Sequence, residues 1–374
     1  MMPDGFWEND APHVAVNPHQ PADSAGLAAF ADSAGLLRTC FFQTSGSEGV
    51  PKWVALAKEA FLISASAVNA HFRVTRNDRW LIALPLHHVG GFSILARAHL
   101  TGSSVTYSDT SWSPEGFVRR IQHEGVTLVS VVPTQVHDLV QSRLPSPASL
   151  RAAIVGGGGM SHELAEAARS LGWPVYQSYG MTEAASQIAT QPLQDDMPSE
   201  CLEILPHWRT ELDDSGRLVI SGTALAKGYA MNNNHGGWTW QPLGGQFVTR
   251  DLVQLGEAQG RRWLKFAGRE SGFVKVLGEL IHLAPLQSRL DALALDQKVS
   301  PPPVIAALPD ARRESRLVLV AENATGAGLL EFFNAGAPPL QQLSECIRLP
   351  AIPRSSLGKV NAGELRQMLI SGQV

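Results

Sequence analysis

The sequence predicts an α/β fold: a large N-terminal domain of mostly parallel sheets flanked by helices, with an antiparallel β section, and a small mobile α+β C-terminal domain. Up to residue 180, short β-like runs alternate with helical runs of about 10 to 15 residues, the pattern of a parallel sheet covered on both faces. Beyond residue 200, strand-like runs follow one another across Gly-rich turns, which is typical of antiparallel strands. A length of 374 residues favours two domains.

We place the domain boundary at residue 270, so that the large domain covers residues 1–270 and the small domain covers residues 271–374. Residues 1–35 are rich in Ala, Pro and Asp and show little periodicity, so we expect them to be a loosely packed lead-in. Hydrophobic residues make up 44% of the chain, which argues against disorder on a large scale.

The large domain is expected to begin with a strand at residues 39–43, a glycine-rich loop, and a helix over residues 54–72, whose apolar residues recur at helical spacing. The strands predicted after that helix lie at residues 80–86, 104–107, 127–133, 152–157 and 175–180. The helices between them are predicted from about residue 90 and at residues 114–125, 134–142 and 161–172. The antiparallel strands are predicted at residues 217–222, 246–255 and 261–268.

Charge and cysteine usage narrow the classes of function. Residues 1–258 hold 16 Lys and Arg against 24 Asp and Glu, whereas residues 259–374 hold 14 against 10, which favours an anionic ligand near the junction. The chain has no basic stripe of the kind that binds nucleic acid. Its three cysteines lie far apart, which favours reduced thiols in a cytoplasmic protein over a zinc site. We expect neither a membrane span nor a signal peptide, because the apolar runs are short and the N-terminal residues are acidic.

The stretch TSGSEGVPK (residues 44–52) combines glycines, hydroxyl side chains and a lysine. Between a strand and a helix, glycines let backbone N–H groups turn inward and the helix presents its positive end, so phosphate is the natural ligand. The spacing fits neither a Walker A loop nor a nucleophile elbow. For this stretch taken alone, an ordinary turn is the alternative.

Two further stretches fit a nucleotide site. YGMTEAASQ (residues 179–187) places an acid beside the loop, where it could hold Mg²⁺, although a capped helix start is the alternative. VGGGGMS (residues 155–161) lacks the third glycine of a dinucleotide fingerprint and favours a flat backbone platform for a purine ring. The other stretches that complete the set are FVTRD (247–251), FAGRESGFVKVLGELI (266–281) and IPRSSLGKVNAGEL (352–365).

In this order, the six motifs resemble the AMP-forming acyl-CoA synthetase and adenylation superfamily, from Phe41 to the C-terminus. Members of that superfamily activate a carboxylate with ATP. LPLHHVGGFSIL (84–95) and VSVVPTQVHDLV (129–140) are most similar to the o-succinylbenzoate–CoA ligases of menaquinone synthesis. The resemblance therefore implies an AMP-forming acid–CoA ligase, with o-succinylbenzoate as the best single substrate and another aryl or acyl carboxylate as the alternative.

The resemblance also implies roles for the matching residues. Those implied to hold the β- and γ-phosphates are Thr44, Ser45, Gly46, Ser47, Gly49 and Lys52. Those implied to flank the adenine are Gly156, Gly157, Gly158 and Tyr179, and those implied to bind the ribose hydroxyls are Asp251 and Arg269. The implied catalytic residues are Thr182 at the α-phosphate, Glu183 as the magnesium ligand, His88 beside the acyl pocket, and Lys359.

The chemistry of this class explains those residue types. A carboxylate attacking the α-phosphorus brings two anions together, so catalysis is mainly charge neutralisation and alignment. The implied cofactors are ATP and Mg²⁺, with coenzyme A as co-substrate and a small-molecule carboxylate as partner. In the family the small domain turns at a hinge that aligns with Ser271, so Lys359 would serve the first step only.

Some features depart from the family. Glu48 stands where Thr or Ser is usual. Only 43 residues precede Thr44, so part of the outer layer is expected either to be missing or to come from a partner subunit, with a homodimer as the candidate assembly. An ATP- or AMP-binding pseudoenzyme is one alternative function. A serine hydrolase using Ser47 and His88 is another, and for His88 a hydrogen-bonded core histidine is the structural alternative.

Overall fold

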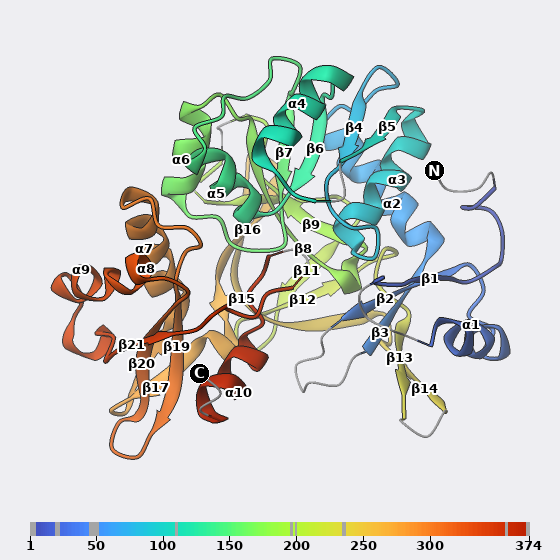
Figure 1. The fold of residues 1–374 in the computed structure, drawn as a ribbon. Helices are drawn as coiled ribbons and strands as arrows, with labels where there is room; N and C mark the ends of the chain where they lie inside the picture. The colour runs from blue at the N-terminus through green and yellow to red at the C-terminus, as the bar shows by residue number, and fades with distance from the viewer. Residues whose placement is uncertain are drawn as a thin grey trace.

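A computed structural model describes residues 5–18, 23–44, 52–108, 111–194, 197–198, 200–233, 237–355 and 358–371. Its main feature is an 11-stranded sheet with the order β11-β12-β15-β16-β10-β9-β8-β7-β6-β4-β5 (Figure 1). The strands of its parallel part are β4 (Arg79–Ile82), β5 (Ser104–Tyr107), β6 (Leu128–Val131), β7 (Ala152–Val155) and β8 (Val175–Met181). All five lie where the alternating pattern predicted them.

The sheet becomes antiparallel at the pairing of β8 with β9 (Ser186–Thr190). The strands that continue it are β10 (Leu202–Ile204), β11 (Arg209–Leu212), β12 (Arg217–Ser221), β15 (Gln246–Ala258) and β16 (Arg261–Arg269). The predicted antiparallel section is therefore confirmed, and it is hydrogen-bonded directly to the parallel part.

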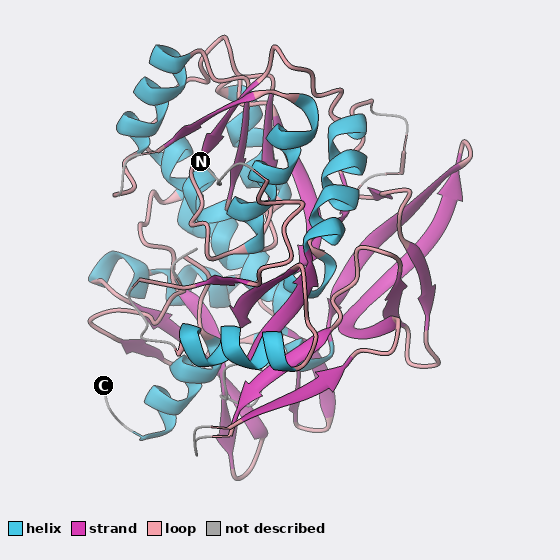
Figure 2. Ribbon diagram, turned by 90° about the vertical axis from the view of Figure 1, so that its right-hand side faces the viewer, coloured by secondary structure: helices cyan, strands magenta, loops and turns pink. Residues whose placement is uncertain are grey.

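Helices cover both faces of the parallel part (Figure 2). On one face lie α2 (Lys58–His71) and α3 (Val89–Thr101), whose Phe61 and Phe92 pack in one core cluster with Ile82 and Ile154 of the sheet. On the other lie α4 (Pro114–Glu124), α5 (Pro133–Gln141) and α6 (His162–Ser170), which pack with the alternate strand residues Leu81 and Val155. Because side chains alternate along a strand, continuous apolar runs were needed to fill both layers.

A second sheet has the order β1-β2-β3-β13-β14. Its strands are β1 (His13–Ala15), β2 (Thr39–Thr44), β3 (Lys52–Ala57), β13 (Gly228–Asn232) and β14 (Trp238–Pro242). The prediction that a helix covers residues 54–72 was wrong at its start. Residues 52–57 form a strand antiparallel to β2, and the helix begins at Lys58. The glycine-rich loop thus joins two strands, and β3 separates it in sequence from α2, the helix that was expected to follow it directly.

The N-terminal residues pack more closely than their composition predicted. Phe6 and Trp7 are buried at 7% and 3% exposure and belong to the core cluster around Phe92. Helix α1 (Ser24–Ser33) buries Leu27 and Ala31. The apolar residues of this segment are too few to show periodicity, yet Phe6, Trp7, Leu27 and Ala31 all contribute to the core.

Residues 271–374, which we call the lid, follow the short helix η2 (Glu270–Gly272), which contains Ser271. The lid elements are β17 (Phe273–Val276), β18 (Glu279–His282), α7 (Leu283–Asp296), β19 (Val304–Asp310), β20 (Glu314–Ala321), α8 (Ala324–Ala327), α9 (Leu329–Ala335), η3 (Pro339–Gln341), β21 (Cys346–Arg348) and α10 (Ala362–Ser371). Two core clusters contain lid residues alone, from Val274 to Leu369. They support the division at residue 270, which stays a prediction; we call residues 1–270 the body.

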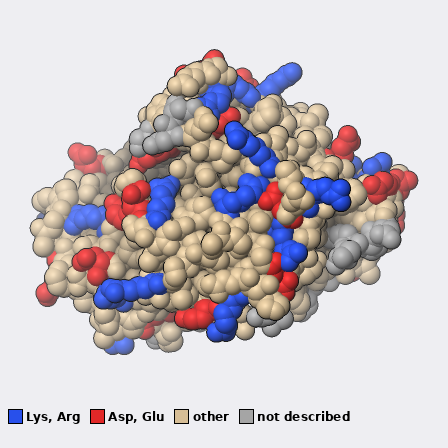
Figure 3. Space-filling view, turned by 90° about the horizontal axis from the view of Figure 1, so that it is seen from above, with Lys and Arg blue, Asp and Glu red and all other residues tan. Residues whose placement is uncertain are grey.

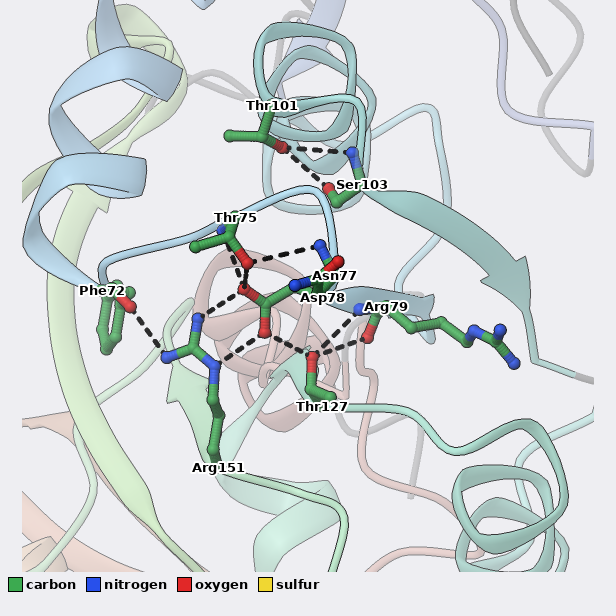
Figure 4. A network of polar contacts seen from close by, with 9 residues as sticks. All are labelled: Phe72, Thr75, Asn77, Asp78, Arg79, Thr101, Ser103, Thr127 and Arg151. Carbon is green, nitrogen blue, oxygen red and sulfur yellow. Dashed lines mark hydrogen bonds and ion pairs between the residues drawn. The ribbon is translucent and has the colours of Figure 1, made fainter.

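A network of polar contacts lies at the edge of the sheet where the parallel strands begin (Figure 4). Asp78 accepts hydrogen bonds from Nε of Arg151 at 2.7 Å, from the backbone N–H of Thr75 at 2.8 Å and from the hydroxyl of Thr127 at 2.8 Å. Burial alone would raise the pKa of Asp78, but these bonds and the Arg151 charge lower it to about 2. The network joins the segments that precede β4, β6 and β7.

On the face seen from above, Lys and Arg are interspersed with Asp and Glu (Figure 3). Among the described residues, no helix is both long enough and apolar enough to cross a bilayer.

Candidate active site

The predicted site residues gather where the parallel strands end. Gly156 to Gly158 follow β7, and Tyr179 and Thr182 lie at the end of β8. In open α/β sheets this edge is where ligands bind, because helix N-termini and strand ends open there without covering side chains. The alternating sequence pattern therefore brings these separate motifs to one place.

Asp251 on β15 is hydrogen-bonded to two other predicted residues, Tyr179 and Arg269. Its Oδ2 accepts a hydrogen bond from the Tyr179 hydroxyl at 2.7 Å, and its Oδ1 accepts one from Nε of Arg269 at 2.6 Å. Asp251 is 2% exposed, whereas the Arg269 side chain is 53% exposed. Burial and the Asp251 charge raise the pKa of Tyr179, so this phenol stays protonated and donates. The remaining lone pairs of the carboxylate suit hydroxyl donors such as those of a ribose.

Glu183 lies in the short helix η1 (Thr182–Ala184). Two hydrogen bonds hold it, one from β13 and one from the segment just before β13. The Tyr229 hydroxyl donates to Glu183 Oε1 at 2.9 Å, and the backbone N–H of Ala226 donates to the Glu183 carbonyl at 2.8 Å. Lys52 at the start of β3 has its ammonium 5.7 Å from the Tyr229 ring centroid. Lys52 and Glu183, predicted from separate motifs, are thus neighbours of the same tyrosine.

Lys359 of the lid lies near the Asp251 group of the body. Crowding by protein atoms and the positive charge of Arg269 lower the pKa of Lys359, while the negative charge of Asp251 acts in the opposite direction. The residue itself remains exposed. The preceding Gly358 lies against α5, since a Cβ atom there would fall 2.7 Å from the Thr134 hydroxyl oxygen. In this orientation the lid therefore places Lys359 near two residues that the sequence predicted to bind the nucleotide, Asp251 and Arg269.

The predicted adenine platform is built from glycines with close neighbours. A Cβ atom at Gly156 would lie 3.0 Å from the Ser178 hydroxyl, and one at Gly157, whose φ is +79°, would lie 3.3 Å from the Val132 side chain. Gly158 is less restricted, with its nearest atom 3.6 Å away in Pro133. Packing therefore disfavours a side chain at Gly156 and at Gly157, and the adenine role of these glycines stays a prediction.

Backbone strain surrounds Thr182 and Glu183. Ala185 and Ser186 both have positive φ, at 48° and 101°, which is unusual for residues with a Cβ atom. Gly180 packs against the same segment, since a Cβ atom there would lie 1.6 Å from the Ser186 carbonyl oxygen. The tight return from β8 to β9 holds Thr182 and Glu183 at the edge of the sheet.

His88 lies at the start of α3, where its carbonyl accepts the N–H groups of Gly91 and Phe92 at 3.1 and 2.9 Å. Burial and the neighbouring His87 lower the pKa of His88 to about 4. Its imidazole is therefore neutral at neutral pH and suits a polar, uncharged wall of an acyl pocket.

The glycine-rich loop is described only at its ends. Ser45, Gly46, Ser47, Glu48 and Gly49 lie outside the described residues. Thr44 and Lys52 close the loop as paired residues of β2 and β3, with the Thr44 hydroxyl 3.5 Å from the Lys52 carbonyl. The phosphate roles of these residues stay predictions.

Sequence reasoning missed two residues. Tyr229 stands in the stretch KGYAMN (227–232), whose tyrosine between a glycine and an apolar strand was the available signal. Arg97 stands inside the apolar run GFSILARAHL (91–100), where an isolated arginine signals a buried cation.

Among the described residues, the side chains that bond to the Arg97 guanidinium are polar but uncharged. Arg97 is 1% exposed, and its Nη2 donates to Gln187 Oε1 at 2.9 Å. Its guanidinium lies 5.4 Å from the Trp80 ring centroid. Among the described residues, Arg97 Nε and Gln187 Nε2 are buried without a hydrogen-bond partner. Burial lowers the pKa of Arg97 to about 9, so the group stays cationic at neutral pH.

Comparison with known proteins identifies the class. A sequence profile of the family described as AMP-binding enzyme matches residues 38–230. This is more than half of the chain, and the chain belongs to the AMP-binding enzyme family. The resemblance inferred from the motifs is confirmed.

Particular relatives lie in one group. The 2-succinylbenzoate–CoA ligase of Bacillus subtilis (strain 168) is 30% identical over 258 residues, covering 66% of this chain and 52% of the relative. The ligase of the same name from Bacillus velezensis is 31% identical over 268 residues, with the same two coverages of 66% and 52%. The chain therefore spans about half the length of the curated relatives it matches.

Solved structures agree on the fold. The o-succinylbenzoate CoA synthetase (MenE) from Bacillus subtilis, in complex with the acyl-adenylate OSB-AMP, gives a TM-score of 0.72 at 25% identity, covering 88% of this chain and 68% of that chain. The same enzyme with ATP and a magnesium ion gives 0.71 at 26% identity, covering 88% and 69%. An anthranilate CoA ligase, AuaEII, shares the fold with a TM-score of 0.72 at 17% identity, covering 90% and 68%.

Proposed function

We propose that this chain activates a carboxylate with ATP to an acyl-adenylate and then transfers the acyl group to coenzyme A. The observation that carries the proposal is the position of Lys359, whose charge is coupled to those of Arg269 and Asp251 across the contact of lid and body. A protein that only bound nucleotide would not need a lysine brought from a separate domain to that position. The family membership and the named relatives support the same reaction.

In the first step, a carboxylate oxygen of the substrate forms a bond to the α-phosphorus of ATP, and the bond from that phosphorus to the pyrophosphate oxygen breaks. No proton moves, because the acid is already ionised at neutral pH. Lys359 stabilises the negative charge that accumulates on the α-phosphoryl and acyl oxygens. Asp251 and Arg269 hold the ribose, and the glycines after β7 leave room for the adenine.

Glu183 suits a magnesium ion. Mg²⁺ is usually bound by one or two carboxylates together with substrate phosphates, and Glu183 lies next to Lys52, at the end of the predicted phosphate loop. When bound, the ion would supply positive charge to the triphosphate. The Tyr229 hydrogen bond orients the Glu183 carboxylate and leaves its other lone pairs for that role.

In the second step, the sulfur of coenzyme A forms a bond to the acyl carbon, AMP leaves, and the thiol proton is released to solvent. The bond that breaks is the one from the acyl carbon to the oxygen it shares with the phosphate, and AMP leaves with that oxygen. No bond at the α-phosphorus is made or broken, so Lys359, which serves the reaction at that phosphorus, is not required. We therefore propose that the lid turns near Ser271 between the steps.

For the acyl substrate we propose 2-succinylbenzoate, the acid named in the relatives. Arg97 supports an acid with a second carboxylate, because it is a buried cation whose described neighbours include no carboxylate bonded to it. A simple benzoate would leave that cation without compensation.

The test is exchange of labelled pyrophosphate into ATP in the presence of Mg²⁺ and one added carboxylate. We expect exchange with 2-succinylbenzoate, weaker or no exchange with benzoate and fatty acids, and a CoA thioester when free coenzyme A is added. A pseudoenzyme or a serine hydrolase would show no carboxylate-dependent exchange. Exchange with a fatty acid alone would keep the ligase class and reject the substrate.

We further propose a cytoplasmic location and a homodimer. The described cysteines, Cys40, Cys201 and Cys346, are all free, which supports a reducing compartment. Sedimentation equilibrium of the purified chain tests the dimer, and a monomer mass at micromolar concentration would reject it.

A further inference from the structure

One side chain of the lid lies directly against the last long strand of the body. His282, the last residue of β18, contacts Gly268 of β16, since a Cβ atom at Gly268 would lie 2.5 Å from Cε1 of the imidazole ring and closer still to Nε2. That separation is much shorter than a van der Waals contact, so only glycine leaves room for the ring. Gly268 also has a φ of +150°, which would strain a residue with a side chain.

The two residues stand on opposite sides of the proposed hinge at Ser271. Gly268 belongs to the body, where its strand is paired with β15. His282 belongs to the lid, because its neighbour Ile281 on β18 is part of a core cluster of lid residues. A rotation of the chain at Ser271 would therefore separate the imidazole ring from Gly268. The contact is specific to the lid orientation described above.

The direction of the imidazole ring is fixed within the lid. Phe273 of β17 is the cross-strand partner of His282, and the two rings stack with their centroids 4.3 Å apart and an interplanar angle of 11°. Gly272 is also near the ring, because a Cβ atom there would lie 3.8 Å from Cδ2 of His282. The face of the ring thus packs on the lid's own hairpin, and its Nε2 edge is held toward Gly268.

The Nε2 atom of His282 is an unusual group for a contact that only fills space. Among the described residues it is buried and has no hydrogen-bond partner. A buried polar atom without a partner costs free energy, so an apolar side chain would pack there more favourably. Separation from Gly268, the residue against this atom, would open it to water. Such a contact holds the lid in one place and still allows it to leave.

We propose that His282 is a positioning residue that seats the lid on Gly268 for the first step of the reaction. The seated lid brings Lys359 near the residues predicted to bind the nucleotide, and release of the ring frees the lid for the second step. This inference rests on the proposed function, because a two-step ligase needs the lid in two places. His282 makes and breaks no bond itself and acts through the position of Lys359.

His282→Ala removes the ring and keeps the backbone pairing of the hairpin. We expect pyrophosphate exchange to fall by about three- to tenfold, because docking loses part of the contribution of a buried side chain. Thioester formation from supplied acyl-adenylate should not fall, because Lys359 is not required in that step. His123→Ala, which changes an exposed histidine on α4, is the control and should change neither rate.

Helix α5 provides a measure of lid docking that needs no substrate. Gln141 of α5 donates to the carbonyl oxygen of Leu295 on α7 at 3.5 Å, and Thr134 lies against Gly358 of the lid. In His282→Ala the α5 amides should exchange their hydrogens with solvent faster, by the same factor as the loss of pyrophosphate exchange, because the lid covers them for less of the time.

Gly268→Ala gives the discriminating measurement. The added Cβ atom would overlap the His282 ring, so the lid should be unseated and pyrophosphate exchange should fall by at least about fivefold, the cost of overpacking. In the His282→Ala background the same substitution should have a much smaller effect, since no ring remains to meet the new atom. Gly260→Ala is the matched control and should change neither step. Gly260 also has a positive φ, lies in the turn between β15 and β16, and has open space around it.

Three results would overturn the proposal. One is an equal effect of Gly268→Ala with and without the His282 ring. Another is equal loss of both steps in either single variant, which general unfolding or a disturbance of the neighbouring Arg269 would cause. The third is exchange of the α5 amides at an unchanged rate in His282→Ala.

Failure of this inference can be distinguished from failure of the proposed function. Absence of pyrophosphate exchange with every carboxylate would reject the proposed function, whereas exchange of the α5 amides measures lid docking without any substrate. An active enzyme whose α5 exchange and step rates do not depend on positions 268 and 282 would reject only the inference.

Discussion

At the scale of single residues, Asp251 connects the residues of the predicted nucleotide site. It is buried on β15 and accepts hydrogen bonds from Tyr179 on β8 and Arg269 on β16, so residues from three strands converge on one carboxylate. The motif order implied Asp251 and Arg269 as a pair. Their bond to Tyr179 could not be foreseen, because it depends on how β8 and β15 lie in the same sheet.

Tyr229 gives the first prediction. Tyr229→Phe keeps the ring beside Lys52 and removes the 2.9 Å hydrogen bond to Glu183. A hydrogen bond to a charged group contributes about 1.5 to 3 kcal/mol, so we expect at least a tenfold higher Mg²⁺ concentration for half-maximal pyrophosphate exchange. Titration of Mg²⁺ at saturating ATP measures this. Tyr107→Phe, an exposed tyrosine on β5, is the control. An unchanged midpoint would show that Tyr229 does not orient the carboxylate.

Asp78 gives a prediction about stability. The pKa of Asp78 is lowered from 3.8 to about 2, so its ionised form stabilises the fold above about pH 4, and this contribution disappears as the pH falls toward 2. We expect Asp78→Asn to lower the free energy of unfolding by about 2 kcal/mol at pH 7. Urea denaturation at pH 7 and at pH 3 measures it, and the difference between the two proteins should shrink at pH 3. Glu166, the exposed ion-pair partner of Arg169, serves as control. Glu166→Gln should lower the free energy of unfolding by less than about 0.5 kcal/mol.

At the scale of elements, alternation of strands and helices was enough to predict the parallel part. The strands β4 to β8 and helices α3 to α6 were all foreseen, because each buried strand is a short apolar run between recognisable turns. The strand β3 was not, since WVALA fits a buried strand or a helix equally well and periodicity cannot separate them. Pairing with β2 and β13 decides it, and that pairing involves residues near 230.

The return from β8 to β9 gives a prediction for an element. Gly180→Ala would place a Cβ atom 1.6 Å from a backbone carbonyl, so the turn that carries Thr182 and Glu183 has to shift. We expect loss of pyrophosphate exchange by at least about a hundredfold, as for a misplaced catalytic group. Gly159→Ala is the matched control, because a Cβ atom there would meet nothing within 4 Å beyond its chain neighbours. Full activity in Gly180→Ala would show that the site tolerates this shift.

At the scale of the whole molecule, the lid and the body meet so that Lys359 lies near Arg269 and Asp251. The motif order predicted which lysine this would be. Nothing in the sequence indicated that Gln141 of α5 would donate a hydrogen bond to the Leu295 carbonyl of α7, because both are ordinary helix residues until the two domains meet. Burial between domains is a property of the assembly and leaves no local pattern.

Lys359→Ala tests the arrangement of domains. We expect it to abolish adenylate formation, by about a thousandfold or more, while thioester formation from supplied acyl-adenylate persists. Pyrophosphate exchange and a coupled CoA assay measure the two steps separately. Lys298→Ala, an exposed lid lysine, should leave both unchanged. Equal loss of both steps in Lys359→Ala would contradict a role confined to the first.

Arg269 is the last residue of β16, and η2 begins at the next residue. The side chain proposed to hold the ribose therefore lies two residues from Ser271, the proposed hinge. A rotation of the chain at that hinge would also change the direction of the Arg269 guanidinium. The proposal thus predicts that loosening of the bound nucleotide and movement of the small domain occur together.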